Sequence, residues 1–189
     1  MKYLGCGHFS DVFDLGNGSV FKAYKRKNVG EQESNQNDND ELTKALYRSE
    51  LKAYEIIHSE KELSDFFASF YGVADPHELL SFIDGYKEKY VSGCGLIIEY
   101  VVGEESKMPH VAPEIYDLVD ETLDRANALL SPLGINSYDS SCINIGDGKF
   151  KLIDFGLWQD DENYYEKSLV SNLEFSDNER TELARKFTT

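Results

Sequence analysis

Cysteine is scarce in this sequence, and its scarcity excludes the folds that depend on it. The 189 residues contain only three cysteines, Cys6, Cys94 and Cys142. Their number is odd and their spacing is wide, so they fit neither a disulfide framework nor the closely spaced ligands of a zinc site. We therefore expect a protein of a reducing, intracellular compartment.

Basic residues are few compared with acidic ones. The chain has 19 lysines and arginines against 35 aspartates and glutamates, which gives a formal net charge of −16. Such a surface repels the phosphates of a nucleic acid before any base is read, so a nucleic-acid partner is not expected. A protein, a small molecule or a cationic partner fits the charge better.

Long apolar runs are absent. No run approaches the ~20 apolar residues that a membrane-spanning helix needs, and the chain enters a glycine-rich segment without a charged and then apolar leader. The sequence thus predicts no membrane partner and a cytoplasmic location. Because 41% of its residues are hydrophobic and 13% aromatic, it can bury a core and form one compact unit.

The clearest chemical pattern is a predicted hairpin over residues 143–154. Two apolar runs flank the turn sequence Gly146-Asp147-Gly148, and Asp154 ends the second run. Asn144 lies in the first run, five residues after Asp139. We expect the side chains of Asp139, Asn144 and Asp154 to converge on one edge of the hairpin, where their oxygens suit a hard cation such as Mg²⁺.

Residues 3–22 predict three strands joined by a glycine loop and a tight turn. They contain the pattern G-x-G-x-x-S-x-V, and the pair Asn17-Gly18 supplies the turn before the last strand. Gly5 and Gly7 would let the backbone approach phosphate oxygens, which a Cβ atom would obstruct. An ordinary hairpin is the alternative interpretation of this segment taken alone.

Lys22 follows two apolar residues on a predicted central strand, where an ammonium group needs a counter-charge or an anionic ligand. From Leu42 to Ile57 apolar residues recur at helical steps, and Glu50 lies on the same inward stripe. We predict that Glu50 is the partner of Lys22. The alternative is a glutamate at the border of an ordinary amphipathic helix. The polar segment 25–41 is predicted to be a surface loop.

Further elements are predicted from the rest of the chain. Residues 66–73 and 95–103 have the composition of strands. An apolar stripe over residues 115–130, which includes Leu118, indicates a helix. Residues 76–91 mix turn and helix signals that do not resolve into one element.

The order of these motifs resembles that of the protein-kinase superfamily. Asp139-x-x-x-x-Asn144 followed by Asp154-Phe155-Gly156 resembles its catalytic loop and its magnesium loop. The glycine loop, Lys22 and Glu50 precede them in the order that the superfamily shows. Each motif alone has a structural explanation, but their joint order is much rarer.

The resemblance implies an α+β, protein-kinase-like fold in one domain over residues 1–189. Residues 1–102 would form the N-lobe, an antiparallel sheet with one helix. Residues 103–189 would form an abbreviated, mainly helical C-lobe, because the chain after Gly156 is too short for the usual set of helices.

The same resemblance assigns roles in the transfer of phosphate from Mg-ATP. It implies that Lys22 binds the α- and β-phosphates and is aligned by Glu50. Asn144 and Asp154 would hold Mg²⁺, and Asp139 would orient the acceptor hydroxyl and take its proton. ATP and Mg²⁺ are therefore the expected cofactors.

Other residues would bind the nucleotide. Gly5 and Gly7 would approach its phosphates, and Val12 would cover the adenine ring from above. By the same resemblance, Ile98 would stand at the back of the adenine pocket. The backbone of Glu99 to Val101 would meet the adenine edge.

The sequence departs from the superfamily pattern at several positions. Ser10 replaces the third glycine of the loop, and Ser137-Tyr138 stands where His-Arg would precede Asp139. Ser141 occupies the position where Ser/Thr kinases carry a lysine that steadies the transferring phosphoryl group. The compact size, the glycine loop and the Ser137-Tyr138-Asp139 stretch are similar to the early protein kinases of T7-like bacteriophages, which would place the protein in a host cytoplasm.

Several functions stay open on the sequence. The leading hypothesis is a minimal, ATP-dependent Ser/Thr protein kinase that acts on a protein substrate. The missing lysine and the short C-lobe favour a pseudokinase that binds a partner without transfer, and small-molecule phosphotransferases also lack that lysine. The net charge of −16 adds an acidic decoy for a nucleic-acid-binding protein.

Overall fold

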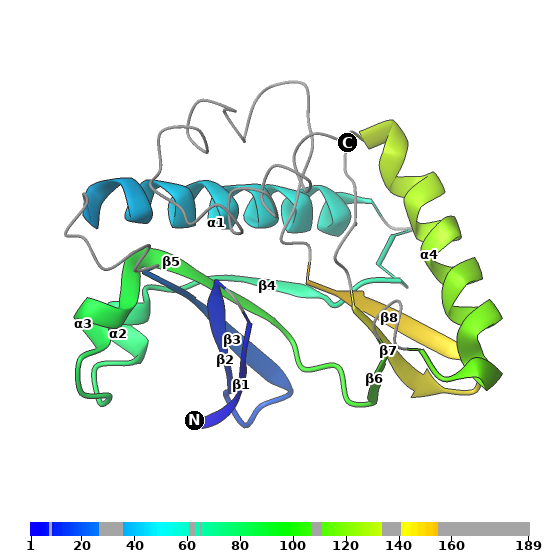
Figure 1. The fold of residues 1–189 in the computed structure, drawn as a ribbon, viewed down its shortest axis with the longest axis horizontal. Helices are drawn as coiled ribbons and strands as arrows, with labels where there is room; N and C mark the ends of the chain where they lie inside the picture. The colour runs from blue at the N-terminus through cyan, green and yellow to red at the C-terminus, as the bar shows by residue number, and fades with distance from the viewer. Residues whose placement is uncertain are drawn as a thin grey trace.

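The fold is mixed α+β, with two antiparallel sheets and few helices (Figure 1). The computed structural model describes residues 1–7, 9–26, 36–60, 63–64, 66–106, 111–133 and 141–154. The expected α+β class is confirmed. Within these ranges, no helix has the length and apolar character needed to cross a membrane.

A five-stranded antiparallel sheet forms the N-terminal part of the molecule. Its strands follow the order β1 (Lys2–Cys6), β2 (Ser10–Asp14), β3 (Ser19–Lys25), β5 (Tyr90–Glu99) and β4 (Phe70–Val73). The first three are the predicted strands, and Asn17 stabilises the turn before β3 by accepting a hydrogen bond from the Ser19 amide over 3.3 Å. β3 is central, so Lys22 pairs with Val12 on one side and with Leu96 on the other.

One long helix, α1 (Gln36–Ser59), packs on the sheet (Figure 1). It begins before the apolar stripe at Leu42, so the prediction of a surface loop is wrong for residues 36–41. That stretch has no apolar periodicity to reveal a helix. An ion pair of 2.8 Å between Asp40 and Arg26 ties it to the end of β3 instead.

The other face of the sheet is covered by the segment whose structure the sequence left unresolved. It folds into α2 (Pro76–Leu79) and α3 (Tyr86–Lys89) before β5 begins. Asp75 caps α2 by accepting a hydrogen bond from the His77 amide over 2.8 Å. This segment and the strands share a second, smaller core, formed by Phe13, Phe21, Ala23, Leu80 and Tyr90.

The predicted hairpin belongs to a three-stranded antiparallel sheet. Its strands follow the order β6 (Glu104–Ser106), β7 (Ser141–Gly146) and β8 (Lys149–Ile153). Asp147 and Gly148 form the turn with φ angles of 54° and 69°, the positive values that this type of two-residue turn requires. The short turn fixes the register of β7 against β8.

A parallel bridge joins the two sheets. Phe67, just before β4, pairs with Leu152 of β8, and the Leu152 amide donates to the Phe66 carbonyl over 2.7 Å. Both bridge side chains are fully buried in a core that also includes residues of α1, β3, β5 and α4 (Tyr116–Leu130). The end of β8 is therefore held against the five-stranded sheet.

The predicted helix α4 lies beside the second sheet (Figure 1) and buries Val119, Ala126 and Leu130. Leu118 is 44% exposed, so its place on the predicted buried stripe is wrong. It lies about 100° from Val119 around the helix axis, which puts it outside the buried face.

Truncation at the joint between the sheets should cost far more stability than the same truncation on the surface. We expect Leu152→Ala to lower the free energy of unfolding by about 2–5 kcal/mol, because it leaves a cavity between the sheets. Leu118→Ala is the matched control and should change it by less than about 0.5 kcal/mol. Urea denaturation measures both, and equal losses would show that the joint lies outside the cooperative core.

Candidate functional site

The candidate site is built around the ammonium group of Lys22, which pairs with two carboxylates. Its Nζ donates to both carboxylate oxygens of Glu50, each over 2.8 Å, and to Oδ1 of Asp154 over 2.9 Å. The predicted pairing of Lys22 with Glu50 is confirmed, and Asp154 is a second partner. Three segments far apart in the sequence thus meet at one charge.

Local structure explains each position in this cluster. Side chains alternate along β3, so Lys22 and Tyr24 share the face that α1 covers. Glu50 lies on the inward stripe of α1, is fully buried, and also accepts a hydrogen bond from the Tyr24 hydroxyl. Asp154 directly follows β8 and is the accessible member, with 44% of its side chain exposed against 9% for Lys22.

Burial and the neighbouring charges shift the protonation of the cluster. Burial acts to lower the pKa of Lys22, but Asp154 and Glu50 outweigh it and hold that pKa above its usual range. Burial raises the pKa of the Glu50 carboxyl, and Lys22 opposes this by favouring the carboxylate. Burial and Glu50 also raise the pKa of Tyr24, which stays a neutral donor. One ammonium and two carboxylates leave one net negative charge.

Asp154 has an unusual backbone conformation. Its φ angle is 67°, in the left-handed region that costs a non-glycine residue about 1–2 kcal/mol. Asp147, which also has a positive φ, lies in the hairpin turn that requires it. Asp154 instead follows the end of a strand, where its bond to Lys22 holds it. Strain of this kind concentrates at functional sites.

The structure does not bring Asn144 to Asp154. Asn144 pairs with Phe150, four residues before Asp154, which separates the two by about 13 Å along the strand. The Asn144 side chain accepts a hydrogen bond from the Gly146 amide over 3.0 Å, next to the hairpin turn. The expected convergence is therefore wrong for Asn144, because the two-residue turn sets a register that places it near the tip.

Asp139, the predicted base, lies outside the described residues, as do Ser137-Tyr138 and Phe155-Gly156. Ser141, at the position of the missing lysine, begins β7 and is 2% exposed. It pairs with the residue that precedes Asp154. Ser141 is therefore enclosed and brings no positive charge to the site.

The glycine loop, residues 5–10, has room for a ligand at its glycines. A Cβ atom added at Gly5 would meet nothing within 4 Å, and one added at Gly7 would meet the Ser10 hydroxyl at 3.6 Å. Neither glycine has a positive φ. Packing and backbone conformation thus leave both positions free for larger residues, whereas close approach of a ligand would require glycine. Val12 follows the loop and is half-buried opposite Lys22.

Ile98 and Val101, predicted to contact adenine, lie on either side of the end of β5. Ile98 pairs with Val20 of β3 and with Phe70 of β4, and it is buried in the main core. Val101 is half-buried just beyond the strand. Ile98 is therefore a core residue, and Val101 is the more accessible of the two.

Glu99 forms an ion pair that the sequence did not predict. Its Oε2 accepts hydrogen bonds from the Ser69 amide over 2.9 Å and from Lys151 Nζ over 2.5 Å. Burial acts to raise the pKa of Glu99, but the bonds from Lys151 and Ser69 hold it below its usual range. Lys151 lies on β8, so this pair links the end of β5 to the strand that positions Asp154. The only sequence signal was an acidic residue closing an apolar run.

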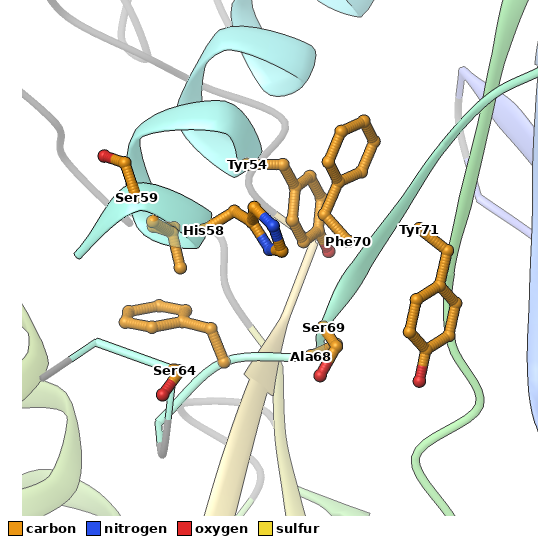
Figure 2. A pocket seen from close by; sticks show the side chains of 10 residues that line it. Tyr54, His58, Ser59, Ser64, Ala68, Ser69, Phe70 and Tyr71 are labelled. Atoms are coloured by element: carbon orange, nitrogen blue, oxygen red, sulfur yellow. The ribbon is translucent and has the colours of Figure 1, made fainter. Parts of the chain in front are cut away.

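A separate cavity of about 420 Å³ opens between α1 and the segment that leads into β4 (Figure 2). Tyr54 and His58 of α1 and Phe70 and Tyr71 of β4 line it, and the rings of Tyr54 and Phe70 stack with centroids 5.9 Å apart. Among the described residues, no carboxylate or lysine lines this cavity.

No protein-family model, curated protein or solved structure matches this chain. In the part of the chain that the structure describes, no group of three or more histidine, cysteine, aspartate or glutamate side chains could hold a metal ion. A metal at Asp154 would need further ligands, which the phosphate oxygens of a nucleotide can supply.

The two partners of Lys22 make the substitutions in this cluster unequal. Lys22→Met leaves the Glu50 carboxylate buried without its cation and should lower the free energy of unfolding by about 3–5 kcal/mol. Glu50→Gln should cost clearly less, because Lys22 keeps Asp154, and the double variant Lys22→Met/Glu50→Gln should recover most of the loss. Urea denaturation tests the ranking. If Glu50→Gln were the more damaging single change, the Asp154 contact would contribute nothing to stability.

Proposed function

We propose that this chain is a minimal kinase-like phosphotransferase that binds Mg-ATP and transfers the γ-phosphoryl group to a serine or threonine hydroxyl of a protein. The observation that carries the proposal is the ammonium group of Lys22 held between Glu50 and Asp154. Protein kinases use a strand lysine paired with a helix glutamate, together with a metal-binding aspartate. The five-stranded antiparallel sheet with one long helix packed on it supports the assignment of residues 1–102 to an N-lobe.

Lys22 would bind the α- and β-phosphates of ATP. Glu50 fixes its ammonium group in one place, so binding would lose little additional side-chain freedom. The phosphates would replace Asp154 and not Glu50, because the Asp154 side chain is 44% exposed and that of Glu50 only 1%. The glycine loop would let the backbone approach the same phosphates.

Asp154 would hold Mg²⁺ together with phosphate oxygens. Nucleotide sites commonly bind this ion through one or two carboxylates plus the phosphates, and the exposed carboxylate of Asp154 is a suitable hard ligand. The bound metal would neutralise charge on the phosphates during transfer. Asn144 lies too far along the hairpin to share the metal, so among the described residues we assign the metal to Asp154 alone.

Asp139 would orient the acceptor hydroxyl and take its proton. In the sequence it precedes Ser141 by two residues, and Ser141 pairs with the residue before Asp154. The enclosed Ser141 supplies no cation to the transferring group, so transfer should be slow even in the wild type.

A pseudokinase that binds a protein partner is the second candidate. The enclosed Ser141 and the separation of Asn144 from Asp154 favour it, because each removes a part of the usual transfer machinery. A small-molecule phosphotransferase would show the same Lys22 cluster and would differ only in its acceptor. An assay with labelled ATP, Mg²⁺ and both protein and small-molecule acceptors separates the three.

Nucleotide binding should depend on magnesium through Asp154. We expect the wild type to bind ATP more tightly when Mg²⁺ is added. In Asp154→Asn this Mg²⁺-dependent increase in affinity should be smaller by a factor of about ten or more, the usual effect of losing one charged contact. Asp147→Asn is the matched control, because it removes the same charge at the exposed far end of the hairpin, and it should leave the gain unchanged. Calorimetry measures all three, and no binding by the wild type at millimolar Mg-ATP would overturn the proposed function.

Transfer should depend on Asp139. Asp139→Asn preserves size and most hydrogen bonding, so it should bind Mg-ATP normally and lose about 10²–10⁴ in transfer rate, the usual contribution of one positioned general base. Single-turnover transfer of labelled phosphate, compared with calorimetric affinity, measures the two effects separately. Equal transfer by variant and wild type would show that Asp139 has no catalytic role.

A further inference from the structure

A second buried charge cluster lies away from the Lys22 site, around Asp11 of β2. Asp11 is 1% exposed, and alternation along β2 places it on the opposite face from Val12. Its carboxylate accepts hydrogen bonds from Lys89 Nζ over 2.6 Å, the Tyr90 hydroxyl over 2.7 Å and Lys25 Nζ over 3.1 Å. The proposed function uses none of these groups.

Lys25 connects this cluster to the glycine loop. Its Nζ donates to the Gly7 carbonyl over 2.8 Å as well as to Asp11. Its backbone amide donates to the Phe9 carbonyl over 2.8 Å. One residue therefore holds the loop at two places, by its side chain and by its backbone.

The far end of the cluster is anchored in the fold. Lys89 ends α3, and the Arg26 amide donates to its carbonyl over 2.8 Å. Arg26 in turn pairs with Asp40 of α1 over 2.8 Å. The glycine loop is thus connected, through Asp11 and Lys25, to elements on both faces of the sheet.

The Asp11 carboxylate keeps its charge in this position. Burial acts to raise the pKa of Asp11, but the hydrogen bonds from Lys89, Tyr90 and Lys25 outweigh it and hold that pKa below its usual range. Lys89 and the Tyr90 hydroxyl bind its Oδ2, and Lys25 binds its Oδ1. The same ammonium group also donates to the Gly7 carbonyl, and this second bond acts on the loop.

Resting on the proposed function, we propose that Lys25 is a positioning residue. By holding the Gly7 carbonyl, it fixes the glycine loop in the position from which the loop amides can donate to the nucleotide phosphates. Without this bond the loop would have to become ordered when the nucleotide binds, and that ordering would weaken affinity. Asp11 holds Lys25 at the correct place and does not itself touch the loop carbonyl.

Three variants separate this role from a general contribution to stability. Lys25→Met removes the bond to Gly7 and keeps the length and apolar stem of the side chain. Lys25→Arg keeps a donor that can reach both acceptors. Lys89→Met removes a partner of Asp11 and leaves Lys25 in place, which makes it the matched control.

Amide hydrogen exchange of residues 5–10 without nucleotide and calorimetry with Mg-ATP are the two measurements. We expect Lys25→Met to exchange faster in the loop and to bind Mg-ATP about tenfold more weakly. Its exchange across α1 and its melting temperature should match those of Lys89→Met. Lys25→Arg should recover both loop protection and affinity.

Two results would overturn the inference. Unchanged loop exchange in Lys25→Met would show that Lys25 does not hold the loop, and equal effects of Lys25→Met and Lys89→Met would reduce the cluster to a stabiliser of the sheet. If wild type fails to bind Mg-ATP, the proposed function falls and the nucleotide role of Lys25 falls with it. If wild type binds and Lys25→Met binds equally well, only the role of Lys25 is wrong.

Discussion

The buried ammonium group of Lys22 is the constraint on which the rest of the structure depends. A cation on a central strand must be paired, because an unpaired buried charge is too costly to persist. Glu50 pairs with it from the helix and Asp154 from the end of the second sheet. The ion pairs of this one ammonium group therefore constrain both the position of α1 on the sheet and the position of β8 beside it.

The unequal exposure of the two carboxylates gives them different roles toward Lys22. Glu50 is enclosed and bound also by Tyr24, so it acts as a fixed support. Asp154 is accessible and has a strained φ angle, so under the proposed function it is the partner that phosphates would displace. Phosphates that take the place of Asp154 on Lys22 would free that carboxylate for a metal. The metal and the nucleotide would then bind as one unit, and the metal alone would compete poorly with Lys22.

The sequence predicts those features that follow from local rules. Lys22 and Glu50 could be paired because a buried lysine needs a carboxylate and only one lay on the inward helical stripe. The hairpin followed from its turn sequence, but the place of Asn144 did not, since a difference of two or three residues in turn length moves every pair along the ladder. The ion pairs of Asp11 and Glu99 were not predicted because their lysine partners are distant in sequence and look like surface residues.

β8 is the strand that connects the second sheet to the first beside the Lys22 cluster. The Phe67–Leu152 bridge holds the strand near its end, Glu99 pairs with Lys151 on one side of that bridge, and Lys22 pairs with Asp154 on the other. Three attachments within four consecutive residues leave the strand little freedom to slide. β7 is paired with β8 in a register set by a two-residue turn. The start of β7, at Ser141, is therefore held opposite Ile153, next to Asp154.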